Sequence, residues 1–403
     1  MKIGLVTGEY PPMAGGVGAF SQELARALAA DGHEVHIITS AQAWPPDIKK
    51  KFQRVREPFD LGFAQIHPYI KKWGLGELHN MVDIAIRQEL ELVNIQYQAA
   101  AYNMRSPAVN LLPWRLRGVA VTAVTFHDLR VPYLFPKAGR LRRTAVNFMA
   151  RQADGVIATN PEDYEALRRL GVGDSRLAQI PIGSNIEVYD VTSQEITAVR
   201  AELSLAADDF LLGYFGFLNE SKGADTLIHA LVDLPENVHL VFIGGRTGSS
   251  DTANNAAFWQ QLDDLITQLN LTQRVHWTGF VPAHHVSAWL QATDVLVMPY
   301  RDGASLRRGT LMAALAHGRP LITTTPTTPT PELAHGRNVW LVPSDDAAEL
   351  AAAIQMLRDD ADLCQRLGRE AAKTAELFTW EKIAGDTAVF FQQLLKLQNK
   401  RIS

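Results

Sequence analysis

Three loops rich in glycine and basic residues hold the side chains with the clearest chemical use. Gly15-Gly16 follows a short apolar run near the start of the chain, Lys222-Gly223 follows a second run, and Arg307-Arg308 follows a third. Glycines after a strand let the backbone approach a ligand, and the N–H groups that begin the next helix favour an anion. Lysine can neutralise a phosphate, and arginine can bind two of its oxygens at once. The three loops together predict a site for a phosphorylated ligand.

Each loop also has a plainer interpretation. The glycines alone fit a tightly packed turn, a lone lysine is usually solvated, and two adjacent arginines can form a basic surface. The spacing matches neither the dinucleotide-binding fingerprint nor the Walker loop, in which Gly-Lys is followed by Ser or Thr. The phosphate interpretation therefore depends on all three loops, each of which follows a strand.

Short β-prone runs alternate with helical spacing around these loops. The expected strands are 3–7, 35–39, 92–96, 120–125 and 155–158 in the first half, and 210–216, 239–243, 275–278, 295–298 and 320–323 in the second. This alternation builds parallel sheets with helices on both faces, and ligands bind at the carboxyl ends of the strands. We expect an α/β protein with domains at 1–190 and 200–376 and a helical tail at 377–403.

Length and composition limit the class of protein. A chain of 403 residues is too long for one ordinary core, and 47% hydrophobic with 20% charged residues is typical of a folded soluble protein. The net charge of -4 argues against a general nucleic-acid binder. The single cysteine, Cys364, excludes a disulfide framework and a multi-thiolate metal site. With no apolar run near the roughly 20 residues of a membrane span, we expect a cytoplasmic protein.

The ordered set of motifs resembles the glycosyltransferases of family 4, which have two facing Rossmann-like domains, the GT-B architecture. The set comprises the Pro-Pro…Gly-Gly-x-Gly loop at 11–18, Thr-Phe-His-Asp at 125–128, Pro-Ile-Gly-Ser-Asn at 181–185, Gly216 with Lys222-Gly223, Gly-Phe-Val at 279–281, Asp-Val-Leu-Val-Met-Pro at 294–299, the small-residue helix at 314–320 and Thr-Pro-Glu at 330–332. It covers nearly the whole chain, and it is specific for the family but weak for the substrate.

The resemblance implies a glycosyltransferase that moves a sugar from a nucleotide-diphosphate sugar to an acceptor hydroxyl, retains the anomeric configuration, and needs no metal or other cofactor. Gly16 would supply an amide to the donor diphosphate, Lys222 would neutralise the leaving phosphate, and His127 would lie beside the donor sugar. The donor-binding candidates are Gly15, Gly16, Gly216, Phe280, Val281, Ser305, Leu306, Arg307, Arg308 and Thr310. Phe280 and Val281 mark the place of the nucleobase. The two domains would face each other across a cleft.

The tail carries an apolar stripe that another element must cover. It either closes the second domain or crosses back onto the first. We favour the second arrangement because the resemblance implies it.

Two departures from the family pattern bear on activity. Ser305 and Ala313 stand where the family usually has two glutamates, the second of which binds the ribose hydroxyls. Phe217 stands where an arginine is usual. Thr310, one helical turn before Ala313, is a candidate to replace part of the ribose contact. We hypothesise that Arg307 or Arg308 takes over the lost phosphate contact.

These departures leave other functions open. A family member could bind a nucleotide or sugar without transferring it, and an epimerase could use the same fold. The epimerase needs carboxylate acid–base groups, which we do not find at strand ends. The presence of His127, Lys222 and the glycine loop favours an active transferase.

The acceptor side is less defined. The stretch 44–74 mixes Lys49, Lys50, Lys51, Arg54, Arg56, Lys71 and Lys72 with Trp44, Phe52, Phe59, Phe63, Tyr69 and Trp73, and Arg140, Arg142 and Arg143 add to the basic surface. Such a surface could receive a glycan, a lipid-linked or a small-molecule acceptor, or contact the inner membrane face as a peripheral protein. A solvated loop with a few core aromatics is the plainer interpretation, and we favour it.

Overall fold

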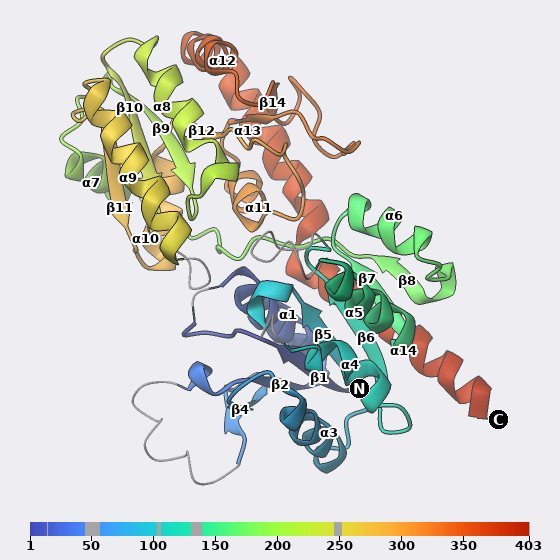
Figure 1. Ribbon diagram of the computed structural model, residues 1–403. Coiled ribbons are helices and arrows are strands. Elements are labelled where there is room, and N and C mark those ends of the chain that lie inside the picture. Colours follow the sequence, from blue (N-terminus) through green and yellow to red (C-terminus); the bar gives the residue numbers. More distant parts are fainter. Residues whose placement is uncertain (14, 45–56, 103–105, 130–138, 246–251, 403) are drawn as a thin grey trace. The chain divides into compact units, whose positions relative to one another are not determined.

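The computed structural model describes residues 1–13, 15–44, 57–102, 106–129, 139–245 and 252–402. The chain forms two compact units (Figure 1). Unit 1 comprises Met1–Ile182 with Trp380–Ser403, and unit 2 comprises Gly183–Thr379. The division falls after Ile182, somewhat before the boundary expected at about residues 190–205 from the polar stretch there. The C-terminal helix belongs to the first unit, as the resemblance implied.

Unit 1 is built on an eight-stranded sheet with the order β3-β4-β2-β1-β5-β6-β7-β8. Its strands are β1 (Lys2–Thr7), β2 (Glu34–Ser40), β3 (Phe59–Asp60), β4 (Gln65–Ile70), β5 (Leu92–Tyr97), β6 (Val121–Phe126), β7 (Gly155–Ala158) and β8 (Leu177–Gln179). Its helices are α1 (Gly16–Ala30), α3 (Leu78–Arg87), α4 (Ala108–Arg115), α5 (Gly139–Gln152), α6 (Pro161–Arg169) and α14 (Trp380–Ile402), with short 3-10 turns at Ala41–Ala43, Leu75–Glu77, Ala99–Ala101 and Asp174–Arg176. All neighbouring strands are parallel except β3 and β4, which the sequence did not indicate.

Unit 2 is built on a six-stranded parallel sheet with the order β11-β10-β9-β12-β13-β14. Its strands are β9 (Phe210–Phe215), β10 (Val238–Ile243), β11 (Val275–Gly279), β12 (Val295–Met298), β13 (Leu321–Thr324) and β14 (Trp340–Val342). Its helices are α7 (Ser193–Glu202), α8 (Ala224–Val232), α9 (Thr252–Gln268), α10 (Ala283–Ala292), α11 (Gly309–Ala316), α12 (Ala347–Asp359) and α13 (Ala361–Ala375), with 3-10 turns at Glu220–Lys222 and Glu376–Phe378.

Each sheet has a point at which the strand order reverses. In unit 1, β1 lies between β2 and β5, and in unit 2, β9 lies between β10 and β12. Ligands of open parallel sheets bind outside the carboxyl ends of the strands at this point. The glycine loop at 8–16 follows β1, the lysine loop follows β9 and the arginine loop follows β12. The sheet topology therefore places the three predicted loops at ligand-binding positions within their units.

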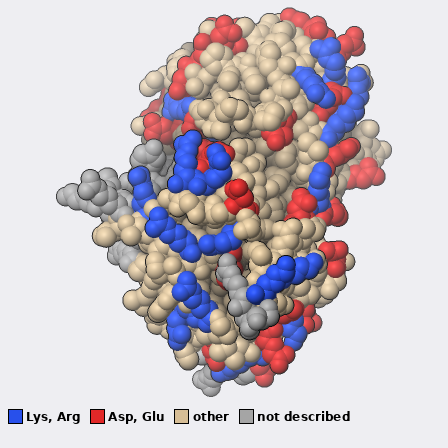
Figure 2. Space-filling view, turned by 90° about the vertical axis from the view of Figure 1, so that its right-hand side faces the viewer, with Lys and Arg blue, Asp and Glu red and all other residues tan. Residues whose placement is uncertain are grey.

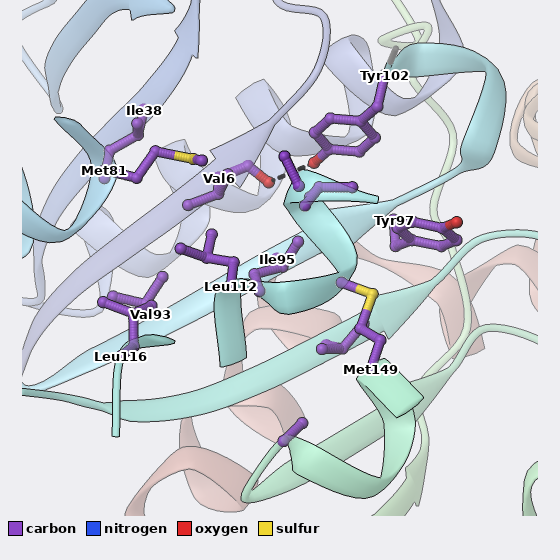
Figure 3. Close-up of a cluster of buried hydrophobic side chains, with 14 of the residues drawn as sticks. Val6, Ile38, Met81, Val93, Ile95, Tyr97, Tyr102, Leu112, Leu116 and Met149 are labelled. Carbon is purple, nitrogen blue, oxygen red and sulfur yellow. Dashed lines mark hydrogen bonds between the residues drawn. The ribbon is translucent and has the colours of Figure 1, made fainter. Parts of the chain in front are cut away.

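The hydrophobic core of unit 1 holds the ends of β1 and β5 in place. Apolar side chains from the strands and from α3, α4 and α5 pack together, among them Met81, Ile95 and Leu112 (Figure 3). The Tyr102 hydroxyl lies 3.0 Å from the carbonyl oxygen of Val6 and 2.8 Å from that of Gln96. This contact joins the ends of β1 and β5, the strands that flank the reversal point.

The apolar stripe of α14 is covered by unit 1. The helix packs on α1 and β6, and the rings of Trp380 and Phe20 meet edge-on at 5.2 Å. A Cβ added at Gly155 would overlap the Leu394 side chain, so β7 requires glycine where α14 crosses it. Among the described residues, no helix combines the length and the apolar character needed to cross a membrane.

Candidate functional site

In unit 2, the lysine and arginine loops meet around one aromatic ring. Lys222 Nζ lies 5.1 Å and Arg308 Cζ 4.0 Å from the centre of the Tyr300 ring. Asp302 contacts both arginines: its Oδ2 is 3.3 Å from Arg307 Nη2, and its Oδ1 accepts a hydrogen bond from Arg308 Nη2. Both arginine side chains are only 9% exposed. We call Lys222, Arg307 and Arg308 the cationic cluster.

The cationic cluster carries more positive charge than Asp302 balances. Burial lowers the pKa of Lys222 well below its usual range, and Arg308 and Arg307 lower it further, while Asp302 acts in the opposite direction. Arg308 Nε is buried and has no hydrogen-bond partner in the structure. An anionic ligand would supply that partner and restore the charged form of Lys222. The arrangement is suited to binding phosphate groups.

The lysine loop is held against the arginine loop by close contacts. Gly223 has φ +67°, and a Cβ there would overlap the Pro299 carbonyl oxygen at the end of β12. Arg301 connects the same segments, because its backbone N–H donates to Ser221 O at 3.0 Å and its Nη1 donates to Glu220 O at 3.0 Å. The position of Lys222 is thus set by backbone contacts on both sides of it.

The beginning of α11 borders the cationic cluster. Thr310 Oγ1 is 2.9 Å from the Tyr300 hydroxyl, and its methyl group would be 2.6 Å from a Cβ added at Gly216. Ala313 on the same helix is fully buried. Thr310 therefore lies beside Gly216, which follows β9. Its role as a partial substitute for the missing ribose contact stays a prediction.

Ser305 and Leu306 contribute differently from the arginines that follow them. The Ser305 carbonyl accepts a hydrogen bond from the Arg308 N–H at 3.1 Å, which shapes the loop. The Leu306 side chain is buried. Its backbone, rather than its side chain, is the group that remains a donor-binding candidate.

Two exposed aromatic rings follow β11 and β9, the two strands that flank β10. Phe280 after β11 is 83% exposed and Phe217 after β9 is 40% exposed. A Cβ added at Gly245 would lie 3.7 Å from an atom of each phenylalanine, so the two side chains lie close together. Val281 is half-buried next to Phe280. Exposed rings at this edge can stack on a flat heterocycle, and Phe217 was missed because the sequence showed only the loss of an arginine.

In unit 1, the amides that begin α1 are partly used by the protein itself. Glu9 Oε1 accepts hydrogen bonds from the N–H groups of Val17 at 3.1 Å and Gly18 at 3.3 Å. A Cβ at Gly15 would overlap the Glu9 carboxylate, so Gly15 has a structural reason to be glycine. Burial raises the pKa of Glu9, and the two amides partly oppose that rise. The sequence predicted that the N–H groups at the start of this helix are open to a ligand, and at Val17 and Gly18 that prediction is wrong, because both donate to Glu9.

Gly16 differs from its neighbour. It is exposed, and a Cβ there would meet nothing within 4 Å among the described atoms. Its surroundings leave room for a ligand beside the start of α1.

His127 follows β6 and contacts one polar and one aromatic side chain. Its Nε2 is 2.9 Å from Gln96 Oε1, and the Phe20 ring meets it edge-on at 4.6 Å. Burial lowers the pKa of His127 to about 3, so the ring is neutral near pH 7. Gln96 was not singled out from the sequence, because a glutamine in a strand has no pattern that marks it.

Two family models match the chain, one in each unit. The model described as "Glycosyl transferase 4-like domain" matches residues 15–183, and "Glycosyl transferases group 1" matches residues 209–360. The chain belongs to the family 4 glycosyltransferases. The resemblance inferred from the ordered motifs is confirmed.

Relatives of this family 4 glycosyltransferase include D-inositol 3-phosphate glycosyltransferases. The protein of Xylanimonas cellulosilytica is 27% identical over 96% of this chain and 94% of its own length. The protein of Streptomyces avermitilis is 27% identical over 62% of this chain, and the match spans 54% of that relative, about half its length.

Solved structures with the same fold extend over the whole chain. Sucrose-phosphate synthase from Thermosynechococcus elongatus has a TM-score of 0.78 and 23% identity, and covers 98% of this chain and 100% of its own. Anabaena HepE in complex with UDP and glucose has a TM-score of 0.75 and 20% identity, and covers 97% of this chain and 99% of its own. The family 4 glycosyltransferase described here has the GT-B fold.

The basic and aromatic stretch at 44–74 is only partly described. Lys49, Lys50, Lys51, Phe52, Arg54 and Arg56 lie outside the described residues. Trp44 and Trp73 are buried, and Trp73 packs edge-on against Tyr102 at 4.7 Å. These two aromatic residues belong to the core of unit 1 and are not exposed to receive an acceptor.

Proposed function

We propose that this family 4 glycosyltransferase transfers a sugar from a nucleotide-diphosphate sugar to an acceptor hydroxyl, and that the donor diphosphate binds at the cationic cluster. The observation that carries this proposal is the convergence of Lys222, Arg307 and Arg308 at the strand ends beside the reversal point of unit 2. The solved structures of Anabaena HepE with UDP and with UDP-glucose support a nucleotide-sugar donor.

The proposed chemistry uses positive charge at the bond that breaks. As the glycosidic bond opens, charge grows on the leaving phosphate, and Lys222 with the arginines would stabilise it. These cations supply the charge neutralisation that a divalent metal would otherwise provide, so the proposed reaction needs no metal. Retention of the anomeric configuration is proposed from family membership. Phe280, with Phe217 beside it, would stack on the nucleobase.

Unit 1 would contribute to the sugar end of the donor. His127 is neutral and partly exposed, which suits a contact with a sugar hydroxyl. Gly16 remains the proposed amide for the diphosphate, with Glu9 occupying the adjacent N–H groups.

A second function follows from Ser305 and Ala313, which replace two family glutamates. A protein without those groups could bind a nucleotide or sugar and not transfer it. We favour transfer because Thr310 lies beside Gly216, which follows β9, and because the cationic cluster is intact.

Nucleoside diphosphate release from a panel of UDP-, GDP- and ADP-sugars, with and without generic acceptors, tests the proposal. Acceptor-dependent release by the full chain supports transfer. Tight nucleotide binding with no release on the whole panel supports the binding function, and release that needs no acceptor supports an epimerase.

The variant Arg308→Gln tests whether the donor diphosphate binds at the cationic cluster. Losing one charge-assisted hydrogen bond costs about 1.5–3 kcal/mol, so we expect the Kd for the nucleoside diphosphate to rise roughly 10- to 100-fold. Arg337→Gln, which changes an arginine of unit 2 whose side chain is 75% exposed, is the matched control and leaves Kd unchanged. Equal Kd values for both variants and the wild type would contradict the assignment.

We also propose that unit 1 binds the acceptor, and we test contact of α4 and α5 with an anionic membrane against the solvated surface that we favour. The two helices pack side by side, and each carries an exposed apolar and an exposed basic residue: Trp114 (49% exposed) and Arg115 on α4, and Leu141 (78% exposed) and Arg143 on α5. Apolar and basic side chains together favour the interface of an anionic bilayer. Co-sedimentation with anionic vesicles that is lost at high salt and with Leu141→Glu supports this contact, and equal recovery with neutral vesicles contradicts it.

A further inference from the structure

We propose that Gln96 is a positioning residue for His127: its side-chain carbonyl holds the imidazole with the proton on Nε2, and so leaves Nδ1 as a hydrogen-bond acceptor for a ligand hydroxyl. The tautomer assignment stands on the contacts of unit 1 alone. Its use in catalysis rests on the proposed function.

A chain of buried side-chain amides connects His127 to Thr125, whose hydroxyl lies 3.2 Å from Asn94 Oδ1. Gln96 Nε2 donates to Asn94 Oδ1, and Asn94 Nδ2 lies 3.0 Å from Thr125 Oγ1. Gln96 and Asn94 are fully buried, and Thr125 is nearly so. An amide NH₂ group only donates and an amide oxygen only accepts. In this orientation the NH₂ group of Gln96 is used by Asn94 and its oxygen faces His127, so Nε2 of the ring is the donor.

The strands explain why these side chains meet. Asn94 and Gln96 are alternate residues of β5 and therefore point to one face of the sheet. Gln96 is paired with Thr125 on β6, and the His127 N–H donates to Tyr97 O at 3.0 Å. The backbone of His127 is thus held beside the strand that carries its partner.

The surroundings of His127 keep the ring neutral. Burial is the cause of its lowered pKa of about 3, and the Phe20 ring covers one side of it. A neutral imidazole with a lone pair on Nδ1 attracts a hydroxyl hydrogen and repels a phosphate oxygen. The geometry therefore assigns a hydroxyl-bearing ligand to His127, whereas the cationic cluster fits the phosphates.

The tautomer is measured directly by long-range ¹H–¹⁵N NMR of the full chain labelled with ¹⁵N-histidine, with His127→Gln used to assign the signal. We expect the Nε2–H pattern, unchanged from pH 8 to pH 5. An Nδ1–H pattern would mean that both amides have the reverse orientation, and it would overturn the proposal. A ring that becomes doubly protonated in that range would also overturn it.

Variants of Gln96 separate positioning from packing. Gln96→Met keeps the length and removes the acceptor, so we expect an Nδ1–H signal to appear. Gln96→Glu keeps an acceptor, and we expect it to keep the Nε2–H pattern and to raise the pKa of His127. Gln179→Met, at an exposed position of β8, is the matched control and leaves the His127 signal unchanged. If Gln96→Met also leaves it unchanged, Gln96 does not position the ring.

Kinetics link the tautomer to the proposed reaction. We expect Gln96→Met to lower kcat/KM for the donor roughly 10- to 100-fold, with Gln96→Glu restoring part of the loss near neutral pH. Because the NMR measurement requires no activity, a failed transferase assay and a failed tautomer assignment are distinguishable. An unchanged kcat/KM in Gln96→Met, with the tautomer altered, would overturn the catalytic use of the contact.

Discussion

At the scale of single residues, the candidate site residues of the two units differ in charge. Unit 2 holds the cationic cluster, in which Lys222 has a strongly lowered pKa, and unit 1 holds the neutral ring of His127. A phosphate and a sugar hydroxyl are the groups that such surroundings favour.

Lys222 makes nucleotide binding depend on pH. Its pKa is lowered in the ligand-free protein, and the negative charge of a diphosphate raises it. Between the two pKa values, binding takes up a proton, and affinity therefore falls as the pH rises through that window. Calorimetry at one pH in buffers of different ionisation enthalpy measures this uptake. Proton uptake that persists undiminished in Lys222→Met would show that another group is responsible.

Residues with a sequence pattern were predictable, and residues defined by tertiary contacts were not. Lys222 and Arg308 could be found because they follow strands next to glycines. Glu9, Gln96 and Arg301 could not, since each is a single polar residue that acquires its role from a partner on another segment.

At the scale of elements, glycines at strand ends set the site geometry. Gly223 and Gly279 share φ +67°, but a Cβ at Gly223 would overlap Pro299 O, whereas one at Gly279 would meet nothing within 4 Å. We expect Gly279→Ala to cost about 1 kcal/mol in the free energy of unfolding, and Gly223→Ala about 3 kcal/mol or more, with weaker nucleotide binding. Urea denaturation of both variants checks this. Equal costs would mean that the lysine loop is not fixed against β12.

A buried histidine pair on β2 and β4 makes unit 1 sensitive to acid. His67 Nε2 lies 3.1 Å from His36 Nδ1, and burial, with a smaller contribution from His36, lowers the pKa of His67 to about 3. The unfolded chain protonates His67 near pH 6.5 while the folded chain does not, so stability is lost as the pH falls below that value.

His67→Gln isolates this effect. Between pH 7 and pH 5 we expect the wild type to lose about 2 kcal/mol of unfolding free energy that the variant retains. Urea denaturation at both pH values provides the comparison, with His79→Gln, at an exposed position of α3, as control. An identical pH dependence in His67→Gln and the wild type would refute the assignment to His67.

The strands were predicted with different success for physical reasons. β7 and β12 match the expected 155–158 and 295–298, because apolar runs buried on both faces are distinct in the sequence. Among the strands that were not predicted, β3, β8 and β14 have only two or three residues, too few to show a period, and β4 contains Pro68, which is unusual inside a strand. β3 and β8 lie at the edges of their sheet, as β14 does in unit 2.

At the scale of the whole molecule, the fold follows from the order of motifs along the chain. Each unit has its own sheet and hydrophobic core, and the last helix returns to unit 1. Basic and acidic side chains are interspersed over the face in Figure 2, in keeping with the small net charge. Composition could limit the class of protein, but the family became apparent only from the ordered set of loops.

A crystal structure of the full chain with UDP, GDP or ADP tests the central claim most directly. We predict diphosphate oxygens within about 2.7–3.2 Å of Lys222 Nζ and of the Arg308 guanidinium group. A diphosphate bound elsewhere, with Lys222 still over the Tyr300 ring and Arg308 still in contact with Tyr300 and Asp302, would contradict the proposed donor site.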